Sequence, residues 1–222
     1  MTDIHSHLLY GVDDGATSLE MAQALLAQYA ASGVDSVICT PHQNKTLRRT
    51  DVLRKRFSLF QGEAATSVRL YLGAEIYYYE DMADDLKSGE LLTMNGTPYV
   101  LVEFSLHNEE RIPDAVYELS IAGYRPIVAH IERYGYLTRD VLFEIRENGG
   151  LFQVNARAFE HRSCAKLLKF LLKHEMLDFV ASDCHRDAER NVDFTAAKAY
   201  ILKKFPGQYE KLFGNSGKIF LT

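Results

Sequence analysis

Short apolar and β-branched runs recur along the chain, and the spacing between them is too wide for hairpins. Several of these runs are continuously apolar, which is typical of strands that are covered on both faces. We predict seven strands, at residues 2–5, 35–40, 69–75, 98–104, 126–131, 151–155 and 178–183.

Segments with helical periodicity lie between the predicted strands. Residues 17–31 open with Thr17 or Ser18 as a capping residue followed by Glu20, and Gly33 closes the segment. The apolar side chains of this segment fall on one face, as in a helix that packs against a sheet. The other predicted helices are residues 112–122, 139–147, 165–173 and about 194–204.

The alternation of strands and helices predicts an α/β protein with parallel strands and right-handed crossovers. An open doubly wound sheet and a closed (β/α) barrel both fit this alternation. Six of the seven predicted strands end in a histidine or a carboxylate. In a parallel barrel all strand ends converge on one rim, whereas in an open sheet only the strands at the switch point share a crevice. The polar strand ends therefore favour a barrel.

The candidate ligands at these strand ends are imidazoles and carboxylates. His5 and His7 lie at positions i and i+2 of a strand, so both imidazoles point to one face, and Asp183 and His185 repeat the spacing. Without cations such a cluster would repel itself, and the pKa of its carboxylates would rise. The predicted metal ligands are His5, His7, Asp14, His42, Glu75, Glu103, His130, Asp183 and His185.

This donor set indicates a particular chemistry. Nine ligands suffice for two or three divalent cations that share a bridging carboxylate, and mixed nitrogen and oxygen donors suit Mn²⁺, Zn²⁺ or Fe. Three such cations among four carboxylates leave a charge of +2, which a phosphate dianion would neutralise. Because a metal-bound water ionises near neutral pH, we expect a bridging hydroxide that attacks phosphorus in line.

Composition and charge argue against nucleic-acid-binding, membrane and disulfide-rich classes of protein. The net charge is −5, from 25 Lys and Arg against 30 Asp and Glu, so the chain has no electrostatic reason to bind nucleic acid or anionic lipid. The start of the sequence lacks a signal-peptide pattern, and no apolar run approaches the about 20 residues that span a bilayer. Three cysteines make a disulfide framework improbable, which favours a reducing cytoplasm. No linker is evident, so we predict one domain over residues 1–222.

Seven short motifs occur in an order that resembles one known family. They are HSH at 5–7, DDG at 13–15, TPH at 40–42, GAEIYY at 73–78, EFS at 103–105, AHIERY at 129–134 and ASDCH at 181–185. The chain resembles the PHP (polymerase and histidinol phosphatase) superfamily over residues 3 to about 190. Within it, the chain is similar to the manganese-dependent protein tyrosine phosphatases of bacterial capsule and exopolysaccharide operons.

The resemblance implies a distorted (β/α)7 barrel of the TIM type, a trinuclear metal centre and Mn²⁺ as the metal, with Fe, Zn, Co or Mg as alternatives. His5, His7, Glu75 and Asp183 would hold the first metal; Glu75, Glu103 and His130 the second; Asp14, His42 and His185 the third. Asp13 is the alternative to Asp14, because the two are adjacent and the loop decides which turns inward.

The resemblance also implies the substrate and the residues that bind it. Arg133 and Arg190 match arginines expected to hold phosphate oxygens, which suits the bidentate geometry of a guanidinium. A metal, water or an acid such as His42 would assist the departure of tyrosinate. The usual substrate of the family is the tyrosine-rich tail of an autophosphorylating bacterial tyrosine kinase that controls polysaccharide export.

Four other interpretations compete with this one. The first is a phosphatase for a small metabolite such as histidinol phosphate, which would share the metals. The second is an amidohydrolase, which often has a carbamylated lysine on a strand, but no predicted strand contains lysine. The third is a binding module without activity, which should have lost ligands. The fourth is a cysteine phosphatase, because Cys184 and Arg190 have C-x5-R spacing, but this loop lacks glycine and Asp183 disfavours the thiolate.

Overall fold

The computed structural model describes the chain except residues 108–110, 187, 189, 216, 218–219 and 221–222. Within the described part, nine strands form two sheets in which every pairing is parallel. The first sheet has the order β1 (Thr2–Asp3), β2 (Ser36–Cys39), β4 (Arg69–Leu72). The second has the order β3 (His42–Gln43), β5 (Glu75–Tyr77), β6 (Tyr99–Glu103), β7 (Arg125–Val128), β8 (Leu151–Asn155), β9 (Leu177–Ala181).

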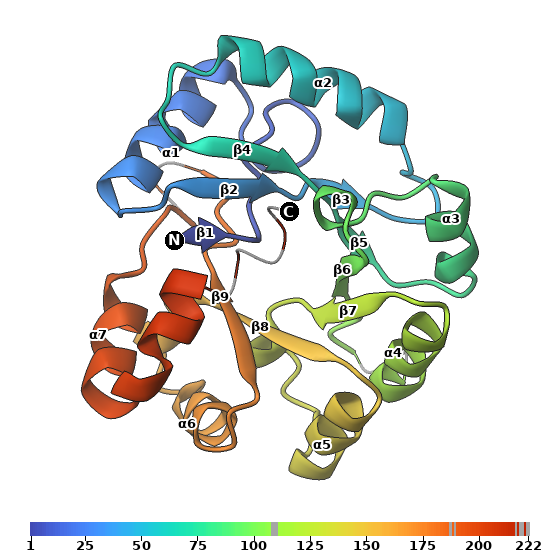
Figure 1. Cartoon of the computed structure of the whole chain (residues 1–222), viewed down its shortest axis with the longest axis vertical. Helices are drawn as coiled ribbons and strands as arrows, with labels where there is room; N and C mark the ends of the chain where they lie inside the picture. The colour runs from blue at the N-terminus through green and yellow to red at the C-terminus, as the bar shows by residue number, and fades with distance from the viewer. Residues whose placement is uncertain (108–110, 187, 189, 216, 218–219, 221–222) are drawn as a thin grey trace.

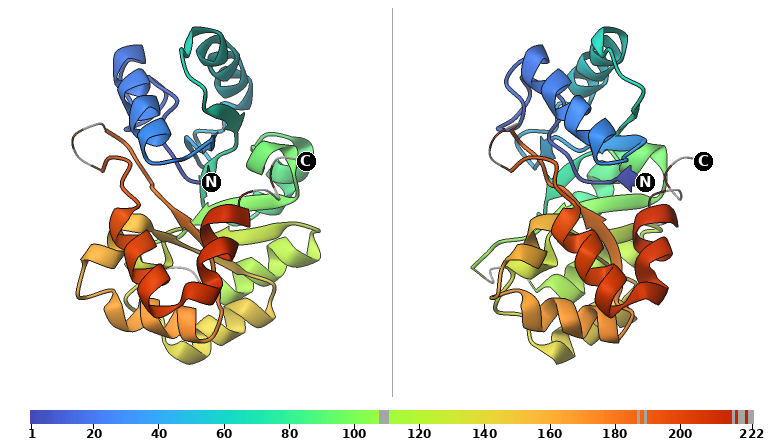
Figure 2. Two further views of the ribbon diagram at one scale, coloured as in Figure 1. Left: turned by 60° about the vertical axis from the view of Figure 1, so that its left-hand side comes forward. Right: turned by 90° about the vertical axis from the view of Figure 1, so that its left-hand side faces the viewer.

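Helices lie around the outside of the strands (Figure 1). The α-helices are α1 (Leu19–Ala31), α2 (Thr50–Glu63), α3 (Met82–Ser88), α4 (Ile112–Ile121), α5 (Arg139–Glu147), α6 (Ala165–Lys173) and α7 (Thr195–Lys204). Short 3₁₀ turns occur at Met94–Gly96, Ile131–Arg133, Ala156–Glu160 and Pro206–Gln208, and a π-helix at Glu210–Asn215. The first two helices and α5 with α6 stand at opposite ends of the long axis (Figure 2). No helix in the described residues is both long and apolar enough to span a bilayer.

The five predicted helices are confirmed, and their ends follow from local chemistry. Ser18 caps α1 by accepting a hydrogen bond from the Met21 N–H at 3.3 Å, and Thr138 caps α5 in the same way. Helices α2 and α3 were not predicted. In α2 only Leu53 and Phe60 are buried, so its sequence carries a weak amphipathic pattern.

One predicted strand is interrupted in the structure, and another is followed by a short strand that was not predicted. The predicted strand 35–40 corresponds to β2, and β3 begins after Pro41, which offers no N–H for a strand ladder. The run 69–75 divides at Gly73, where a Cβ atom would lie 3.0 Å from the sulfur of Met94 and 3.1 Å from Ile38. The short strands β3 and β5 pair with each other and place His42 directly opposite Glu75. Because β3 follows β2 and β5 follows β4 along the chain, the first sheet continues into the second.

Backbone hydrogen bonds join the ends of the first and last strands. The His7 N–H donates to the Cys184 carbonyl at 2.9 Å, and the Asp183 N–H donates to the His5 carbonyl at 2.9 Å. Ser6 and Cys184 form an isolated parallel bridge. The chain that follows β1 thus runs beside the chain that follows β9, although 178 residues separate Ser6 and Cys184.

The core has two parts. The larger packs the helices against the outer faces of the sheets. The smaller contains residues from strands of both sheets and from segments between them, and its buried members are Ile4, Ile38, Met94, Leu101, Ile127, Ala129, Phe179, Ala181 and Phe220. This smaller cluster joins the two sheets through apolar contacts.

Candidate metal centre

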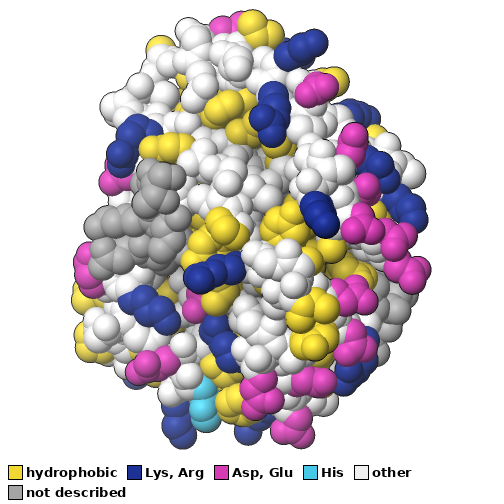
Figure 3. Space-filling view, turned by 45° about the vertical axis from the view of Figure 1, so that its right-hand side comes forward, with side chains coloured by type: hydrophobic (Ala, Val, Ile, Leu, Met, Phe, Trp, Pro, Cys, Tyr) yellow, Lys and Arg dark blue, Asp and Glu magenta, His cyan; other side chains and the backbone are white. Residues whose placement is uncertain are grey.

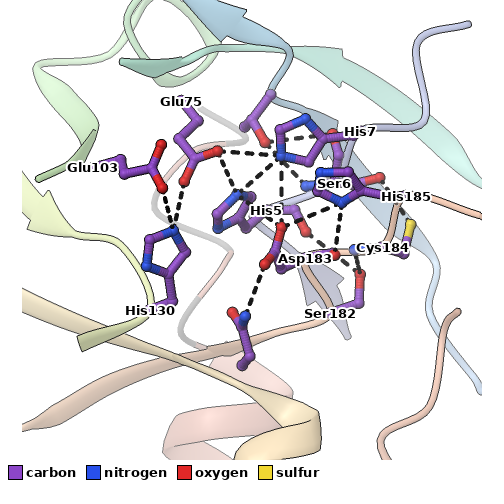
Figure 4. A network of polar contacts seen from close by, with 12 residues as sticks. His5, Ser6, His7, Glu75, Glu103, His130, Ser182, Asp183, Cys184 and His185 are labelled. Atoms are coloured by element: carbon purple, nitrogen blue, oxygen red, sulfur yellow. Dashed lines mark hydrogen bonds and ion pairs between the residues drawn. The ribbon is translucent and has the colours of Figure 1, made fainter. Parts of the chain in front are cut away.

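All nine predicted ligands lie together at the carboxyl ends of the strands (Figure 4 shows seven of them). His42 is on β3, Glu75 is on β5, and Glu103 ends β6. His130 follows β7, and Asp183 follows β9. The remaining members come from the loops after β1 and β9, and they are His5, His7, Asp14 and His185. Parallel pairing brings these distant segments to one rim.

Glu75 lies at the centre of the cluster and is almost fully buried. Its Oε2 is 3.2 Å from His5 Nε2, from His7 Nε2 and from His42 Nδ1. Its Oε1 is 2.9 Å from His130 Nε2. One carboxylate thus faces four imidazoles from three segments, the loop after β1, strand β3 and the end of β7, which is a position suited to a bridging ligand.

Asp183 forms the second focus of the cluster. Its Oδ1 lies 3.4 Å from His5 Nε2 and 3.5 Å from His185 Nδ1. Its Oδ2 accepts hydrogen bonds from Arg190 Nη2 at 2.7 Å and Asn155 Nδ2 at 2.8 Å. One oxygen therefore faces the imidazoles, and the other is held from behind.

The two adjacent aspartates have different surroundings. Asp13 Oδ2 lies 2.8 Å from His7 Nδ1 and accepts from the backbone N–H of His42 at 3.1 Å. Asp14 Oδ1 faces His42 Nε2 at 3.4 Å and His185 Nε2 at 3.5 Å. Asp13 thus holds the back of one imidazole, whereas Asp14 turns its carboxylate toward two imidazoles.

The donor atoms form three compact groups in which all atoms lie within 4.8 Å of one another. These groups are His7, Asp14, His42, His185; His5, His7, Glu75; and His42, Glu75, Glu103. His130 and Asp183 are outside them but contact Glu75 and His5, respectively. The cluster is therefore continuous.

Burial and mutual charge shift the pKa values in the cluster. Burial alone would lower the pKa of His7, but its hydrogen bonds with Asp13 and Glu75 outweigh this and raise it to about 10. Burial would raise the pKa of Asp183, but the charges of His5 and His7 lower it to about 2. Without a cation, Asp183 is thus ionised beside protonated imidazoles, and its pKa is lowered rather than raised as the sequence led us to expect. A divalent cation would replace the imidazole protons as the source of positive charge.

A second observation, besides the ionised carboxylate of Asp183, fits a divalent-metal centre. His185 Nε2 is buried and has no hydrogen-bond partner among the described residues, although it points toward Asp14. A buried polar nitrogen of this kind needs a partner, and a cation provides one. Imidazole and carboxylate donors together suit Mn²⁺, Zn²⁺ or Fe. Almost no histidine is visible on the molecular face in Figure 3, and four of the eight histidines are buried.

Two predicted ligands have a strained backbone conformation. His130 has φ of 30° and Asp183 has φ of 51°, in the left-handed region that side chains other than glycine rarely adopt. Each such residue costs roughly 1–2 kcal/mol, so surrounding contacts must hold it in place. The His130 N–H donates to Gln153 Oε1 at 2.7 Å, which is one such contact.

Gln153 and Asn155 were missed in the sequence analysis. They lie on β8, whose predicted strand is the one without a candidate ligand. The available signal was two polar residues at i and i+2 near the end of an otherwise apolar strand, LFQVN. Neither amide is a usual metal ligand, so the pattern by itself does not predict a role at a metal centre.

The two predicted phosphate-binding arginines lie beside the cluster. Arg190 pairs with Asp183, and Arg133 Nη1 lies 3.7 Å from Glu103 Oε1. Their side chains are 43% and 40% exposed, respectively. Each guanidinium therefore contacts a predicted ligand while part of it remains open to solvent.

Cys184 faces away from the cluster (Figure 4). Its sulfur lies 3.0 Å from the Tyr29 hydroxyl and 3.4 Å from Ser6 Oγ, and it is fully buried. Burial, with a further contribution from Asp3, raises the pKa of the thiol to about 11. A thiolate nucleophile is therefore disfavoured at this position.

Gly15 provides a test of the loop that carries Asp14. A Cβ atom at Gly15 would lie 2.2 Å from the His7 carbonyl oxygen, so the loop must shift to accept a side chain. We expect Gly15→Ala to lower both metal content and activity by about tenfold or more, since misplacement by about 1 Å carries losses of this order or larger. Metal content by elemental analysis and phosphatase assays would measure this.

The matched control is Gly62→Ala on α2, where nothing lies within 4 Å of the new Cβ. This change should leave metal content intact and stabilise the helix by about 0.5–1 kcal/mol. Normal metal content in Gly15→Ala would contradict the close contact between this loop and His7.

The fold and the cluster together define an α/β protein with parallel sheets and a candidate multi-metal centre at its strand ends. The family model for capsular polysaccharide synthesis, CpsB/CapC, matches residues 1–221, and the chain belongs to this family.

Relatives and solved structures agree with this assignment. The tyrosine-protein phosphatase CpsB of Streptococcus agalactiae is 33% identical over 201 residues, which cover 83% of each chain. CpsB of Streptococcus pneumoniae is 31% identical over 95% of this chain and 93% of its own length. A structure from the work on Bacillus subtilis YwqE and S. pneumoniae CpsB, described as unique metal-dependent tyrosine phosphatases, has a TM-score of 0.86 at 26% identity. It covers 92% of this chain and 87% of that one.

A more distant structure shows the fold alone. The histidinol phosphate phosphatase of Lactococcus lactis has a TM-score of 0.59 at 16% identity and covers 91% of this chain and 92% of its own. The predicted resemblance to capsule-operon phosphatases is thus confirmed at the level of the family.

Proposed function

We propose that this protein is a metal-dependent protein tyrosine phosphatase. The observation that carries the proposal is the continuous cluster of five histidines and four carboxylates at the strand ends. The relatives that this chain matches over most of their length are named tyrosine-protein phosphatases. A surface ion-pair network would not bury three imidazoles, those of His5, His7 and His130, around one buried carboxylate, because burial without compensation is costly.

Three metal positions are consistent with the distances. His5, His7, Glu75 and Asp183 would hold one cation; Glu75, Glu103 and His130 a second; and Asp14, His42 and His185 a third. Asp14 is the better choice of ligand, because Asp13 already holds His7 Nδ1. We propose Mn²⁺ as the metal, by analogy with the family that the sequence resembles.

The cations, when bound, would supply a nucleophile at neutral pH and offset the negative charge of the phosphoryl group. Arg133 and Arg190 would orient the phosphate oxygens, since both guanidinium groups are partly exposed at the edge of the cluster. Both nitrogens of His42 face carboxylates, Glu75 and Asp14. We therefore assign His42 to metal binding rather than to protonation of the leaving group.

The proposed substrate is phosphotyrosine in a protein, and the proposed partner is a bacterial tyrosine kinase tail linked to polysaccharide synthesis. Tyrosinate is a fair leaving group, since the pKa of a phenol is about 10. This assignment would place the enzyme in the cytoplasm. We further propose that residues 1–222 fold as one barrel domain of seven strand positions. The bonds between the segments after β1 and β9 support closure of that barrel.

The deciding experiment compares a phosphotyrosine peptide with histidinol phosphate, each with and without added Mn²⁺. We expect kcat/KM to favour the peptide by at least about tenfold and to depend on Mn²⁺. A preference for histidinol phosphate would overturn the substrate and leave the metal centre in place. Metal-independent turnover of the peptide would overturn the mechanism.

A further inference from the structure

Strand β8 contributes two amide side chains to the cluster, although it contributes no predicted ligand. Gln153 and Asn155 are two residues apart, so they project from the same face of the strand. Each of them contacts residues that we propose as metal ligands. The amides lie behind these ligands, where they can determine ligand orientation without touching a cation.

Gln153 holds two histidines from different segments. Its Oε1 accepts the backbone N–H of His130 at 2.7 Å and lies 3.2 Å from His5 Nδ1. The other nitrogen of His5, Nε2, faces Glu75 at 3.2 Å. With Nε2 turned to the cluster, Nδ1 is the nitrogen that donates to Gln153, so the amide determines the tautomer and rotation of the ring.

Asn155 holds Asp183. Its Nδ2 donates to Asp183 Oδ2 at 2.8 Å, which leaves Oδ1 directed at the imidazoles. The orientation of the Asn155 amide is itself set, because Gln153 Nε2 donates to Asn155 Oδ1 at 2.8 Å. The two amides therefore form one chain of hydrogen bonds that runs from His5 to Asp183.

This chain of hydrogen bonds supports the two predicted ligands that have left-handed backbone conformations. His130 and Asp183 adopt left-handed backbone conformations, and the first is held by Gln153 through its N–H, the second by Asn155 through its carboxylate. Without these contacts each residue would lose one of the bonds that oppose relaxation toward an ordinary conformation, although Arg190 would still hold Asp183 Oδ2. The donor atoms would then be placed less accurately in the cluster.

We propose that Gln153 and Asn155 are positioning residues that set the affinity of the centre for divalent cations. They do so as a unit, by fixing the donor atoms of His5, His130 and Asp183 before a cation binds. This inference rests on the proposed metal centre and adds to it a determinant of metal affinity on the one strand that has no ligand.

The test measures Mn²⁺ binding by isothermal titration calorimetry with the full chain stripped of metal. We expect Gln153→Met and Asn155→Leu each to weaken the Kd for Mn²⁺ by about 10–100-fold, the usual effect of removing a partner of a metal ligand. Because the amides act through one chain, the double variant should be about as weak as the weaker single variant, rather than the product of both losses.

Rescue separates positioning from general stability. Gln153→Glu keeps an acceptor for the His130 N–H and for His5 Nδ1, so its Kd should lie closer to the wild-type value than that of Gln153→Met. The control is Asn148→Leu, which removes a comparable amide bond, from Nδ2 to the Pro113 carbonyl at 2.9 Å, far along the chain from the predicted ligands. Its Kd should equal the wild-type value.

Two outcomes would overturn the inference in distinguishable ways. If the wild-type chain bound no Mn²⁺, both the metal centre and the positioning role would fail. If the wild type bound Mn²⁺ and both single variants bound it within twofold of that Kd, only the positioning role would fail. Should Gln153→Met not fold, Asn155→Leu decides, because Asn155 is less buried than Gln153 and its loss touches Asp183 alone among the proposed ligands.

Discussion

Replacing Glu75 by glutamine should reduce kcat/KM for a phosphotyrosine peptide by about 10³-fold or more, which corresponds to about 4 kcal/mol of transition-state stabilisation. Glu75 faces His5, His7, His42 and His130 at distances of 2.9–3.2 Å, so one carboxylate connects most of the cluster. Glutamine has nearly the same shape but lacks the charge, and its NH₂ group would point at atoms that should face a cation.

The physical reason for so large an effect is that Glu75 is shared. In the proposed arrangement it contributes to two metal positions, so its loss disturbs both at once. Hydrogen bonds and charges of the histidines outweigh burial and hold the pKa of Glu75 below its usual range. The carboxylate is thus already in the form that binds cations, and the variant removes that form altogether.

Elemental analysis and steady-state kinetics on the same preparation would measure the loss. Glu63→Gln on α2 is the control, because Glu63 is exposed and its carboxylate accepts a hydrogen bond from the Tyr10 hydroxyl at 2.6 Å, a bond that glutamine can also accept. It should retain full metal content and activity. A Glu75→Gln protein with normal metal content and turnover would show that this carboxylate is not a bridging ligand.

Removal of metal by a chelator should abolish phosphatase activity, and added Mn²⁺ should restore it. Metal binding should also raise the unfolding temperature, since a ligand at 100 times its Kd stabilises the folded state by about 2.7 kcal/mol. Thermal denaturation of stripped and reloaded protein would measure this difference. The effect on activity should be complete, because in the proposed mechanism the bound cations supply the nucleophile.

Cys184→Ser is the matching test of the alternative nucleophile. The sulfur is buried against Tyr29 and Ser6 and faces away from the metal cluster, so serine should retain activity within about threefold. A chelator that left activity intact, together with loss of activity in Cys184→Ser, would end the metal mechanism in favour of a cysteine mechanism.

Much of the site was accessible from sequence because parallel strands align their ends. Histidines and carboxylates at the ends of successive apolar runs must meet if the runs pair in parallel, whatever the exact strand boundaries. His42 and Glu75 were thus both predicted, although each lies on a short separate strand, β3 and β5, rather than at the end of the longer strand before it. The helices α2 and α3 escaped prediction because few of their residues are buried.

The sequence by itself determined which imidazoles and carboxylates follow the apolar runs, and therefore which side chains could form the cluster. Only the tertiary structure decided which aspartate turns inward, and that the amides of β8 hold the ligands. These depend on side-chain directions and on contacts such as that between His5 and Gln153, which are 148 residues apart. No local pattern encodes such a contact, because it arises when the first and eighth strands are brought to the same rim by the packing of the whole chain.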